Sequence, residues 1–287
     1  MENSGVFTSR ELRSKGHSGR SIRAAVDVGN LVAHRPGWYS SPGADSETVS
    51  AIRAGGVLTC CSAFAFYKRQ GIGLWIPPGR DLHVRLSRAA KVKPVSRAGW
   101  VKICQGYGRP IPALTAVDSI PHALNCAARC VNNDYWIAMC DSVLHNTSWT
   151  IPDLQAHMGT VPGKLIALMR RCDAAAESGT ESLVRVRLES AGYRVHVQPR
   201  ISRGRKRGDL RIGRLLLEID SEGSRSGEAR RQDIRRDRKT LGKGWLTMRI
   251  DYREVLESWD EVLADIAELT MAGKHRIGTR DYPLPIE

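Results

Sequence analysis

Residues 209–220 are the part of the chain that most restricts how it can fold. Two short stretches flank the dipeptide Gly213-Arg214, and apolar residues recur at alternate positions within both. A two-residue loop with glycine at its first position is a favoured turn between antiparallel strands. Such a turn fixes the register of the hairpin, because it places Asp209 directly opposite Glu218.

Three acidic side chains fall on one face of this predicted hairpin. The Cβ atoms of Asp209 and Glu218 would lie about 5 Å apart, and Asp220 shares the face of Glu218 because side chains alternate along a strand. Like charges this close are costly unless a cation or protons lie between them. Oxygen ligands favour a hard divalent ion, so we predict that Asp209, Glu218 and Asp220 bind Mg²⁺ or Mn²⁺. The alternative is a structural cluster in which nearby arginines neutralise the acids.

A fourth acidic residue lies on the helix predicted for residues 178–191. Glu181 is three positions before Val184, so both share the inward face of this helix. A carboxylate among core positions needs a partner. Either Glu181 forms a capping box with Ser178, or it belongs to the acidic site.

The chain is strongly basic, with a net charge of +14 over 287 residues. A basic chain usually binds a polyanion, most often nucleic acid, although an ordinary basic enzyme is the alternative. Residues 82–117 contain no acidic residue. Basic side chains outnumber acidic ones between residues 200 and 239. In the second segment a predicted helix carries basic residues that would position phosphates beside the acidic site, or would simply form a solvated surface. The phosphate-positioning candidates are Arg235, Arg236 and Lys239.

The first 41 residues show a pattern of two helices and a hairpin. Thr8 and Ser18 are predicted helix caps, and the turn Arg35-Pro36-Gly37 joins two short strands. This order is typical of a winged helix-turn-helix, whose second helix contacts base edges near its N-terminus. The alternative is that this segment only packs against the rest of the chain. The predicted contacts to double-stranded DNA are Arg20, Ser21 and Arg23 on the second helix and Arg35 on the wing.

Residues 42–177 indicate a mixed α/β region, with helices predicted at 62–70, 115–129, 135–144 and 163–176 and strands at 83–86 and 100–104. Thr115, Asp118 and Asp141 are polar points on otherwise apolar helices. Such positions favour caps or buried hydrogen-bond anchors over catalysis.

The seven cysteines show no CxxC spacing and lie mostly among apolar neighbours. This pattern is typical of reduced core thiols in a cytoplasmic protein. Cys126 and Cys130 are four residues apart, but that pair alone is a weak metal signal. No apolar segment is long enough to cross a membrane, and no secretory signal is found, so we expect a cytoplasmic protein without a membrane partner.

The N-terminal segment "GVFTSRELRSKGHSGRSIRAAVDVGNLVAHRPGWYS" resembles the winged helix of AbiEi-type antitoxins and related actinobacterial regulators. The likeness covers residues 5–40. Residues 178–257 resemble the very-short-patch-repair-type endonuclease domain of the PD-(D/E)xK nucleases, found in actinobacterial proteins of unknown role. The similar stretches are "ESLVRVRLESAGYRVHVQPRI", "GDLRIGRLLLEID", "RRQDIRRDRKTLGKGW" and "LTMRIDYREVL".

The second resemblance implies roles for individual residues. It makes Asp209 and Glu218 the metal ligands and Glu181 the helix carboxylate that supports the site, and it matches Gln198 to a strand glutamine facing the site. Asp233 and Arg236 match an Asp and an Arg of the following helix. Asp220 stands where many relatives carry a lysine, and the histidine that usually follows is absent from residues 221–226. Water activation would then depend on the metal alone or on an unassigned base such as Lys239, and loss of catalysis is the alternative.

We therefore predict an α/β chain with three parts: a winged helix-turn-helix at 1–41, a mixed α/β connecting region at 42–177, and a restriction-endonuclease-like domain at 178–287. The expected function is Mg²⁺-dependent hydrolysis of phosphodiester bonds in DNA, with Glu181, Gln198, Asp209, Glu218 and Asp220 in the active site. The alternative is a non-catalytic repressor or antitoxin-like regulator. A protein-interaction module is a third hypothesis, and a homodimer is one oligomeric state that the sequence leaves open.

Overall fold

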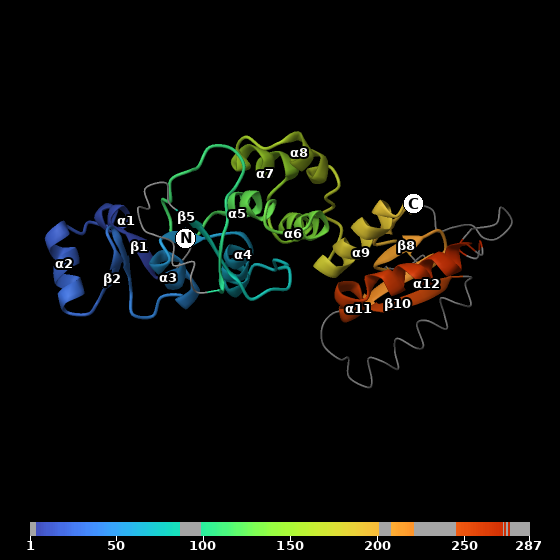
Figure 1. The fold of residues 1–287 in the computed structure, drawn as a ribbon, viewed down its shortest axis with the longest axis horizontal. Coiled ribbons are helices and arrows are strands. Elements are labelled where there is room, and N and C mark those ends of the chain that lie inside the picture. The colour runs from blue at the N-terminus through green and yellow to red at the C-terminus, as the bar shows by residue number, and fades with distance from the viewer. Residues whose placement is uncertain are drawn as a thin grey trace, which may run out of the picture. The chain divides into compact units, whose positions relative to one another are not determined.

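The computed structural model describes residues 4–86, 99–200, 208–220 and 245–271, together with Gly273 and His275 (Figure 1). The chain divides into two compact units, Met1–Arg170 and Arg171–Glu287. Both units combine helices with small sheets, so the chain is a mixed α/β protein, as the sequence predicts. Within the described ranges, no helix is both long and apolar enough to cross a membrane.

The N-terminal part of the first unit is a three-stranded sheet with two helices inserted between its first and second strands. Its strands follow the order β1-β3-β2. Thr8 and Glu11 form a reciprocal capping box at the first helix, and the Ser18 hydroxyl accepts a hydrogen bond from the Ser21 N–H at the second. Both predicted caps are therefore confirmed. The elements are β1 (Val6–Thr8), α1 (Ser9–Ser14), α2 (Gly19–Asp27), β2 (Val32–Arg35) and β3 (Trp38–Ser40).

This N-terminal part shares a core with the segment that follows it. Val6 and Trp38 pack in one hydrophobic cluster with Ile52, Val57 and Ala116. Ile52 belongs to α3 (Ser46–Arg53) and Val57 to β4 (Gly56–Leu58). Residues on both sides of the predicted boundary at 41 thus contribute to one apolar core.

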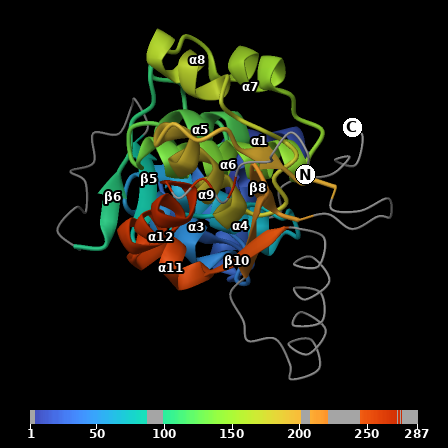
Figure 2. The same cartoon turned by 90° about the vertical axis from the view of Figure 1, so that its right-hand side faces the viewer.

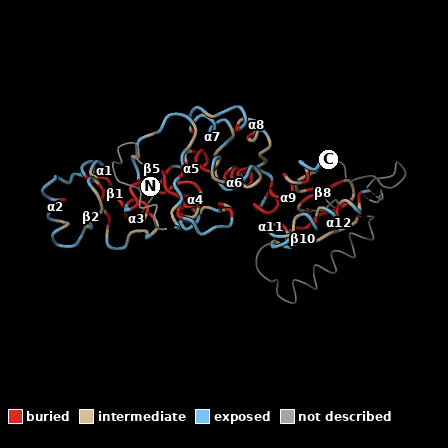
Figure 3. The backbone as a smooth tube through the Cα atoms, in the orientation of Figure 1, coloured by how far each residue is buried: buried red, intermediate tan, exposed pale blue. Residues whose placement is uncertain are grey.

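A second small sheet forms the centre of the first unit. Its strands follow the order β4-β5-β6, with β5 antiparallel to β4 and parallel to β6. The buried stretches of α4, α5 and α6 make the core of this region (Figure 3). Its other elements are β5 (Leu82–Leu86), β6 (Val101–Ile103), α4 (Cys60–Arg69), α5 (Ile120–Ala127), α6 (Asn133–Asn146), α7 (Ile151–Met158) and α8 (Gly163–Met169).

The second unit pairs a helix with a four-stranded mixed sheet. The strand order is β10-β9-β8-β7, in which β7, β8 and β9 are successively antiparallel and β10 runs parallel to β9. After β10 come two helices that pack on each other (Figure 2). The elements are α9 (Gly179–Ser190), β7 (His196–Val197), β8 (Leu210–Ile212), β9 (Leu215–Asp220), β10 (Leu246–Asp251), α11 (Tyr252–Glu257) and α12 (Trp259–Met271).

Several predicted elements have different bounds in the structure. The helix predicted at 115–129 begins only at Ile120, because Val117 first bridges to Leu58 of β4 and Pro121 occupies the first turn of α5. The helix predicted at 163–176 ends at Met169. The spacing of Val255, Trp259, Val262 and Ile266 predicts one closing helix over residues 253–271, but the chain forms two helices that are divided at Ser258.

Candidate carboxylate site and nucleic-acid surface

The hairpin of the second unit has the register that the sequence predicts. Leu210 pairs with Leu217 and Ile212 with Leu215, and extending this register by one residue beyond β8 would set Asp209 opposite Glu218. Gly213 has a φ of +57°, and a Cβ there would collide with the backbone oxygen of His275. Only glycine adopts this positive φ without strain and also leaves the space that a Cβ would fill. Gly213 therefore fixes where the turn lies, and the turn determines which residues of the two strands face each other.

Asp209 and Glu218 occupy different surroundings on the two strands. One carboxylate oxygen of Asp209 accepts a hydrogen bond of 2.7 Å from the backbone N–H of Ile219, which ties the start of β8 to β9. Glu218 is only 6% exposed. It shares a strand face with Leu216, which packs against Trp245.

Glu181 and Gln198 meet beside Asp209. The Oε2 atom of Glu181 accepts hydrogen bonds from the Gln198 side-chain amide at 3.0 Å and from the Glu177 N–H at 3.1 Å. Burial raises the pKa of Glu181, and the negative charge of Asp209 raises it further. Three of the residues assigned to the active site by sequence therefore come together in the structure.

The two interpretations of Glu181 are both partly realised. Ser178 caps α9 by accepting a hydrogen bond of 3.1 Å from the Glu181 N–H. The Glu181 carboxylate accepts hydrogen bonds from the Glu177 N–H and the Gln198 amide and also interacts with the Ser178 hydroxyl. Ser178 therefore both marks the start of the helix and contacts the carboxylate, while Gln198 and Asp209 place that carboxylate among the predicted site residues.

Gln198 has an unusual backbone conformation at the end of β7. Its φ is +47°, one of two positive values among the non-glycine residues that the structure describes. Its N–H donates to the carbonyl of Asp209 at 2.9 Å. Non-glycine residues in this region carry backbone strain and cluster at functional sites. The alternating pattern of residues 193–198 predicts a strand, but only His196 and Val197 have the strand conformation.

Asp220 forms an ion pair with an arginine of the neighbouring strand. Its Oδ1 atom is 3.4 Å from Nη1 of Arg249, and both side chains are partly exposed. Arg249 is also the residue of β10 that pairs in register with Glu218. An arginine on the neighbouring strand therefore borders the acidic face, which agrees with the alternative in which arginines neutralise the acids.

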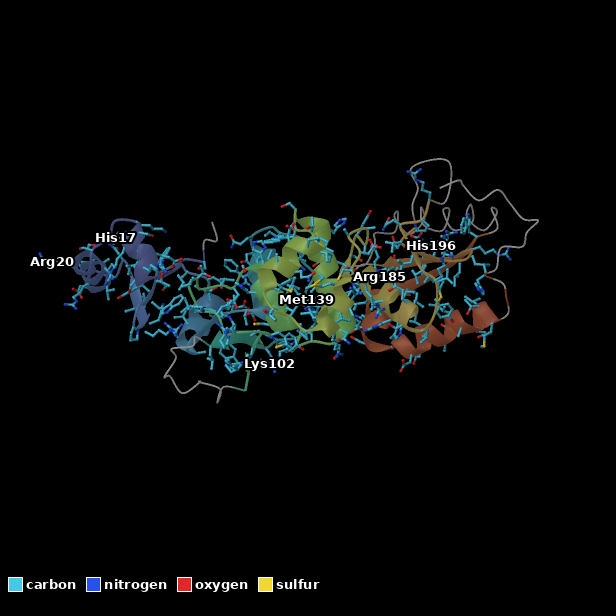
Figure 4. The ribbon with its side chains drawn as sticks, turned by 90° about the horizontal axis from the view of Figure 1, so that it is seen from above. His17, Arg20, Lys102, Met139, Arg185 and His196 are labelled. Atoms are coloured by element: carbon cyan, nitrogen blue, oxygen red, sulfur yellow. The ribbon has the colours of Figure 1, made fainter. Side chains whose placement is uncertain are left out.

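The residues predicted to contact DNA are in three different situations: exposed, hydrogen-bonded within the first unit, or outside the described residues. On α2, Arg20, Ser21 and Arg23 are exposed, and Arg20 extends from the helix toward solvent (Figure 4). Arg35 is instead held inside the unit, donating to the carbonyls of Gly55 at 2.8 Å and Gly56 at 3.0 Å. The predicted phosphate contacts Arg235, Arg236 and Lys239, and the matched Asp233, lie outside the described residues.

A cluster that the sequence analysis missed lies in the first unit. Within the described ranges, one group of His, Cys, Asp or Glu residues has ligand atoms that all lie within 4.8 Å of one another, and it consists of Cys60, His83, Cys104 and Cys130. Contact with the Cys104 thiol lowers the pKa of Cys130. The sequence offers little signal for this cluster, because its members lie more than twenty residues apart at each step and include no CxxC spacing.

Comparison with known proteins identifies no family. No family model matches the chain, and no curated protein matches it. One similar solved structure is the RV2827C protein from Mycobacterium tuberculosis, with 16% sequence identity, a TM-score of 0.32, and coverage of 63% of this chain and 76% of that chain. A likeness at this level assigns neither a fold nor an activity.

Proposed function

We propose that the chain is a DNA-binding protein whose second unit hydrolyses phosphodiester bonds with the help of a divalent cation. The observation that carries the proposal is the meeting of Glu181, Gln198 and Asp209 at a hairpin whose register sets Asp209 opposite Glu218. A helix followed by a mixed four-stranded sheet supports the resemblance to the PD-(D/E)xK nucleases.

The donor set suits a hard cation. Asp209 and Glu218 would hold Mg²⁺ or Mn²⁺ through carboxylate oxygens, with Asp220 as a further ligand. The mutual repulsion of Asp209 and Glu181, seen in the raised pKa of Glu181, is a charge imbalance that a cation would relieve. Such an ion supplies water activation and stabilises the charge that develops on a phosphate.

The residues of this chain then have distinct tasks. Gln198 orients the Glu181 carboxylate through its side-chain amide, and its own N–H is anchored to the Asp209 backbone. Glu181 acts as a positioning group, because its oxygen already accepts two hydrogen bonds. On the first unit, α2 would contact DNA through Arg20, Ser21 and Arg23 in a winged helix-turn-helix arrangement, while Arg35 would fix the hairpin in place.

The test is cleavage of plasmid and linear double-stranded DNA by the full chain. We expect nicking or cutting with Mg²⁺ or Mn²⁺, none in EDTA, and loss of activity by at least about 100-fold in Asp209→Asn. Asp265→Asn makes the same chemical change at an exposed position of α12 and should leave activity unchanged. Equal cleavage by the Asp209 variant would overturn the proposal.

A second function is favoured by the surroundings of Asp220. Its ion pair with Arg249 uses a carboxylate that a cation would need, and neither a lysine nor a histidine stands at the expected positions. The chain would then be a non-catalytic DNA-binding regulator. A mobility-shift experiment in EDTA distinguishes the two, because the regulator binds DNA without metal and cleaves nothing when metal is added.

A further inference from the structure

Four side chains with metal-ligand chemistry converge in the first unit, whereas the residues of the proposed nuclease site belong to the second. The Sγ atoms of Cys104 and Cys130 are 3.0 Å apart, and Nδ1 of His83 is 3.2 Å from the Cys104 Sγ. All four ligand atoms, including the Cys60 Sγ, lie within 4.8 Å of one another. We call these four residues the thiol–histidine cluster.

The fold brings the cluster together from four separate elements. Cys60 begins α4, His83 lies on β5, Cys104 directly follows β6, and Cys130 lies in the turn after α5. Backbone hydrogen bonds tie three of these segments to one another. The His83 N–H donates to the Ser62 hydroxyl at 2.9 Å, and the Cys104 N–H donates to the Val84 carbonyl at 2.8 Å. The cluster is therefore a product of the tertiary fold and not of a local sequence motif.

The arrangement fits a tetrahedral zinc ion. With Zn–S bonds of about 2.3 Å and Zn–N bonds of about 2.0–2.1 Å, tetrahedral geometry puts ligand atoms about 3.6–3.8 Å apart. The observed separations, from 3.0 Å to at most 4.8 Å, bracket that value. Three thiolates and one imidazole are soft to borderline donors, which suit zinc and do not suit Mg²⁺.

Two further features of the structure support a bound ion. Cys60 has a φ of +51°, which a non-glycine residue adopts rarely and at the expense of backbone strain. A bond from the Cys60 sulfur to a metal ion would offset the cost of this backbone strain. Lys102, labelled in Figure 4, donates to the Cys130 carbonyl at 3.2 Å. Its charge would balance the net negative charge of zinc bound to three thiolates.

We propose that Cys60, His83, Cys104 and Cys130 bind one zinc ion in a closed structural site. Four protein ligands complete the coordination, and three of them are buried, so no position is open to a substrate. The ion fastens the sheet β4-β5-β6 to α4 and to the end of α5. Cys61, whose Sγ is 3.8 Å from that of Cys60, lies beside the site without belonging to it.

The first experiment measures the metal in the untagged full chain, produced with zinc in the medium. We expect about one zinc per chain by elemental analysis, and an X-ray absorption spectrum with three sulfur neighbours and one nitrogen neighbour. This measurement needs no variant and so does not depend on whether a variant folds. Zinc below about one tenth of an equivalent, a shell of oxygen and nitrogen only, iron in place of zinc, or a Cys104–Cys130 disulfide would overturn the proposal.

Variants then test the ligand assignment. Cys104→Ser and His83→Ala should weaken zinc retention by more than the roughly 10- to 100-fold that removal of an outer-sphere partner causes. Cys61→Ala and Cys126→Ala are matched controls, the second being a buried cysteine of α5 four residues before Cys130, and both should retain the ion. Zinc-free protein from either control would refute the assignment. DNA cleavage is not the readout, so this result stands independently of the proposed function.

Discussion

Glu181 is a buried carboxylate of the second unit that is held by hydrogen bonds and lies near a second acid. Its residue is only 6% exposed, one of its oxygens accepts two hydrogen bonds, and the charge of Asp209 acts on it. The carboxylate is therefore held in place by its neighbours while its charged form is disfavoured. The protonation of Glu181 therefore reports on its burial and on the charge of Asp209.

The raised pKa of Glu181 gives a direct test. We expect its carboxyl group to titrate above the ordinary value of 4.5, as measured by NMR of ¹³C-labelled glutamate. Because a raised pKa means that the folded state prefers the proton, the stability from this group is complete below about pH 4 and is lost as pH rises through the folded pKa. Asp209→Asn should lower the pKa of Glu181, since a like charge disappears.

The matched comparison is Asp220→Asn, which removes an acid that does not contribute to the pKa shift of Glu181. That variant should leave the titration of Glu181 where it is. A Glu181 that titrates at 4.5 or lower, or that ignores the removal of the Asp209 charge, would contradict the electrostatic interaction between the two acids.

Sequence reasoning located the acids of the hairpin because one turn, Gly213-Arg214, determines their register. It could not locate the thiol–histidine cluster, whose four members are separated by more than twenty residues at each step. Local periodicity carries no information about such long-range packing. It also placed Arg35 on a DNA-facing wing, whereas the structure shows its guanidinium bonded to two backbone carbonyls.

Among the secondary-structure elements, β5 and the segment before α5 are joined by a buried ion pair. The Arg85 guanidinium donates to both carboxylate oxygens of Asp118, at 2.7 and 2.6 Å, and to the Ile111 carbonyl at 2.8 Å. Asp118 is only 3% exposed. The interpretation of Asp118 as a buried anchor is confirmed, and one arginine of the basic segment 82–117 is used inside the fold.

We predict that Asp118→Ala destabilises the protein by about 3–5 kcal/mol, because it leaves a buried guanidinium without its counter-charge. Urea unfolding followed by circular dichroism measures this. The control is Glu47→Ala, which breaks an exposed ion pair with Arg69 and should cost less than about 1 kcal/mol. Similar destabilisation in both variants would show that burial does not set the strength of the Arg85 pair.

Elements with clear start and stop signals were predicted well, and the others were not. Thr8, Ser18 and Ser178 each cap a helix that the structure confirms. The apolar run at 115–129 was extended too far because its first residues pair with β4, a tertiary interaction that overrides helical periodicity. Likewise, Asp251 and Glu254 form a capping box at a short helix that ends before Trp259, so one predicted helix became two.

At the scale of the whole molecule, the two compact units carry different chemistry. The first unit holds the exposed arginines of α2 and the thiol–histidine cluster, and the second holds the carboxylates. Soft and hard metal ligands are thus segregated between units. Specific binding to DNA through α2 and hydrolysis through the hairpin would be separable by mutation.

DNA affinity provides the test at this scale. Replacing Arg20 and Arg23 together by Ala should weaken binding of double-stranded DNA and reduce the slope of log affinity against log salt, by roughly 0.9 for each phosphate that is no longer neutralised. Fluorescence anisotropy over a series of salt concentrations measures both quantities. Lys164→Ala removes an exposed cation of α8 and should change neither. An unaltered slope in the double variant would exclude α2 as the DNA-binding surface.

The apolar cluster that joins Val6 and Trp38 to Ile52, Val57 and Ala116 has a practical consequence. A fragment cut after Ser41 would expose one side of the Trp38 indole to water and would leave Arg35 without its two carbonyl acceptors. Residues 1–41 are therefore not a module that can be transferred to another protein by itself. The smallest transferable form has to extend at least through Ala116, where the last member of the shared core is supplied.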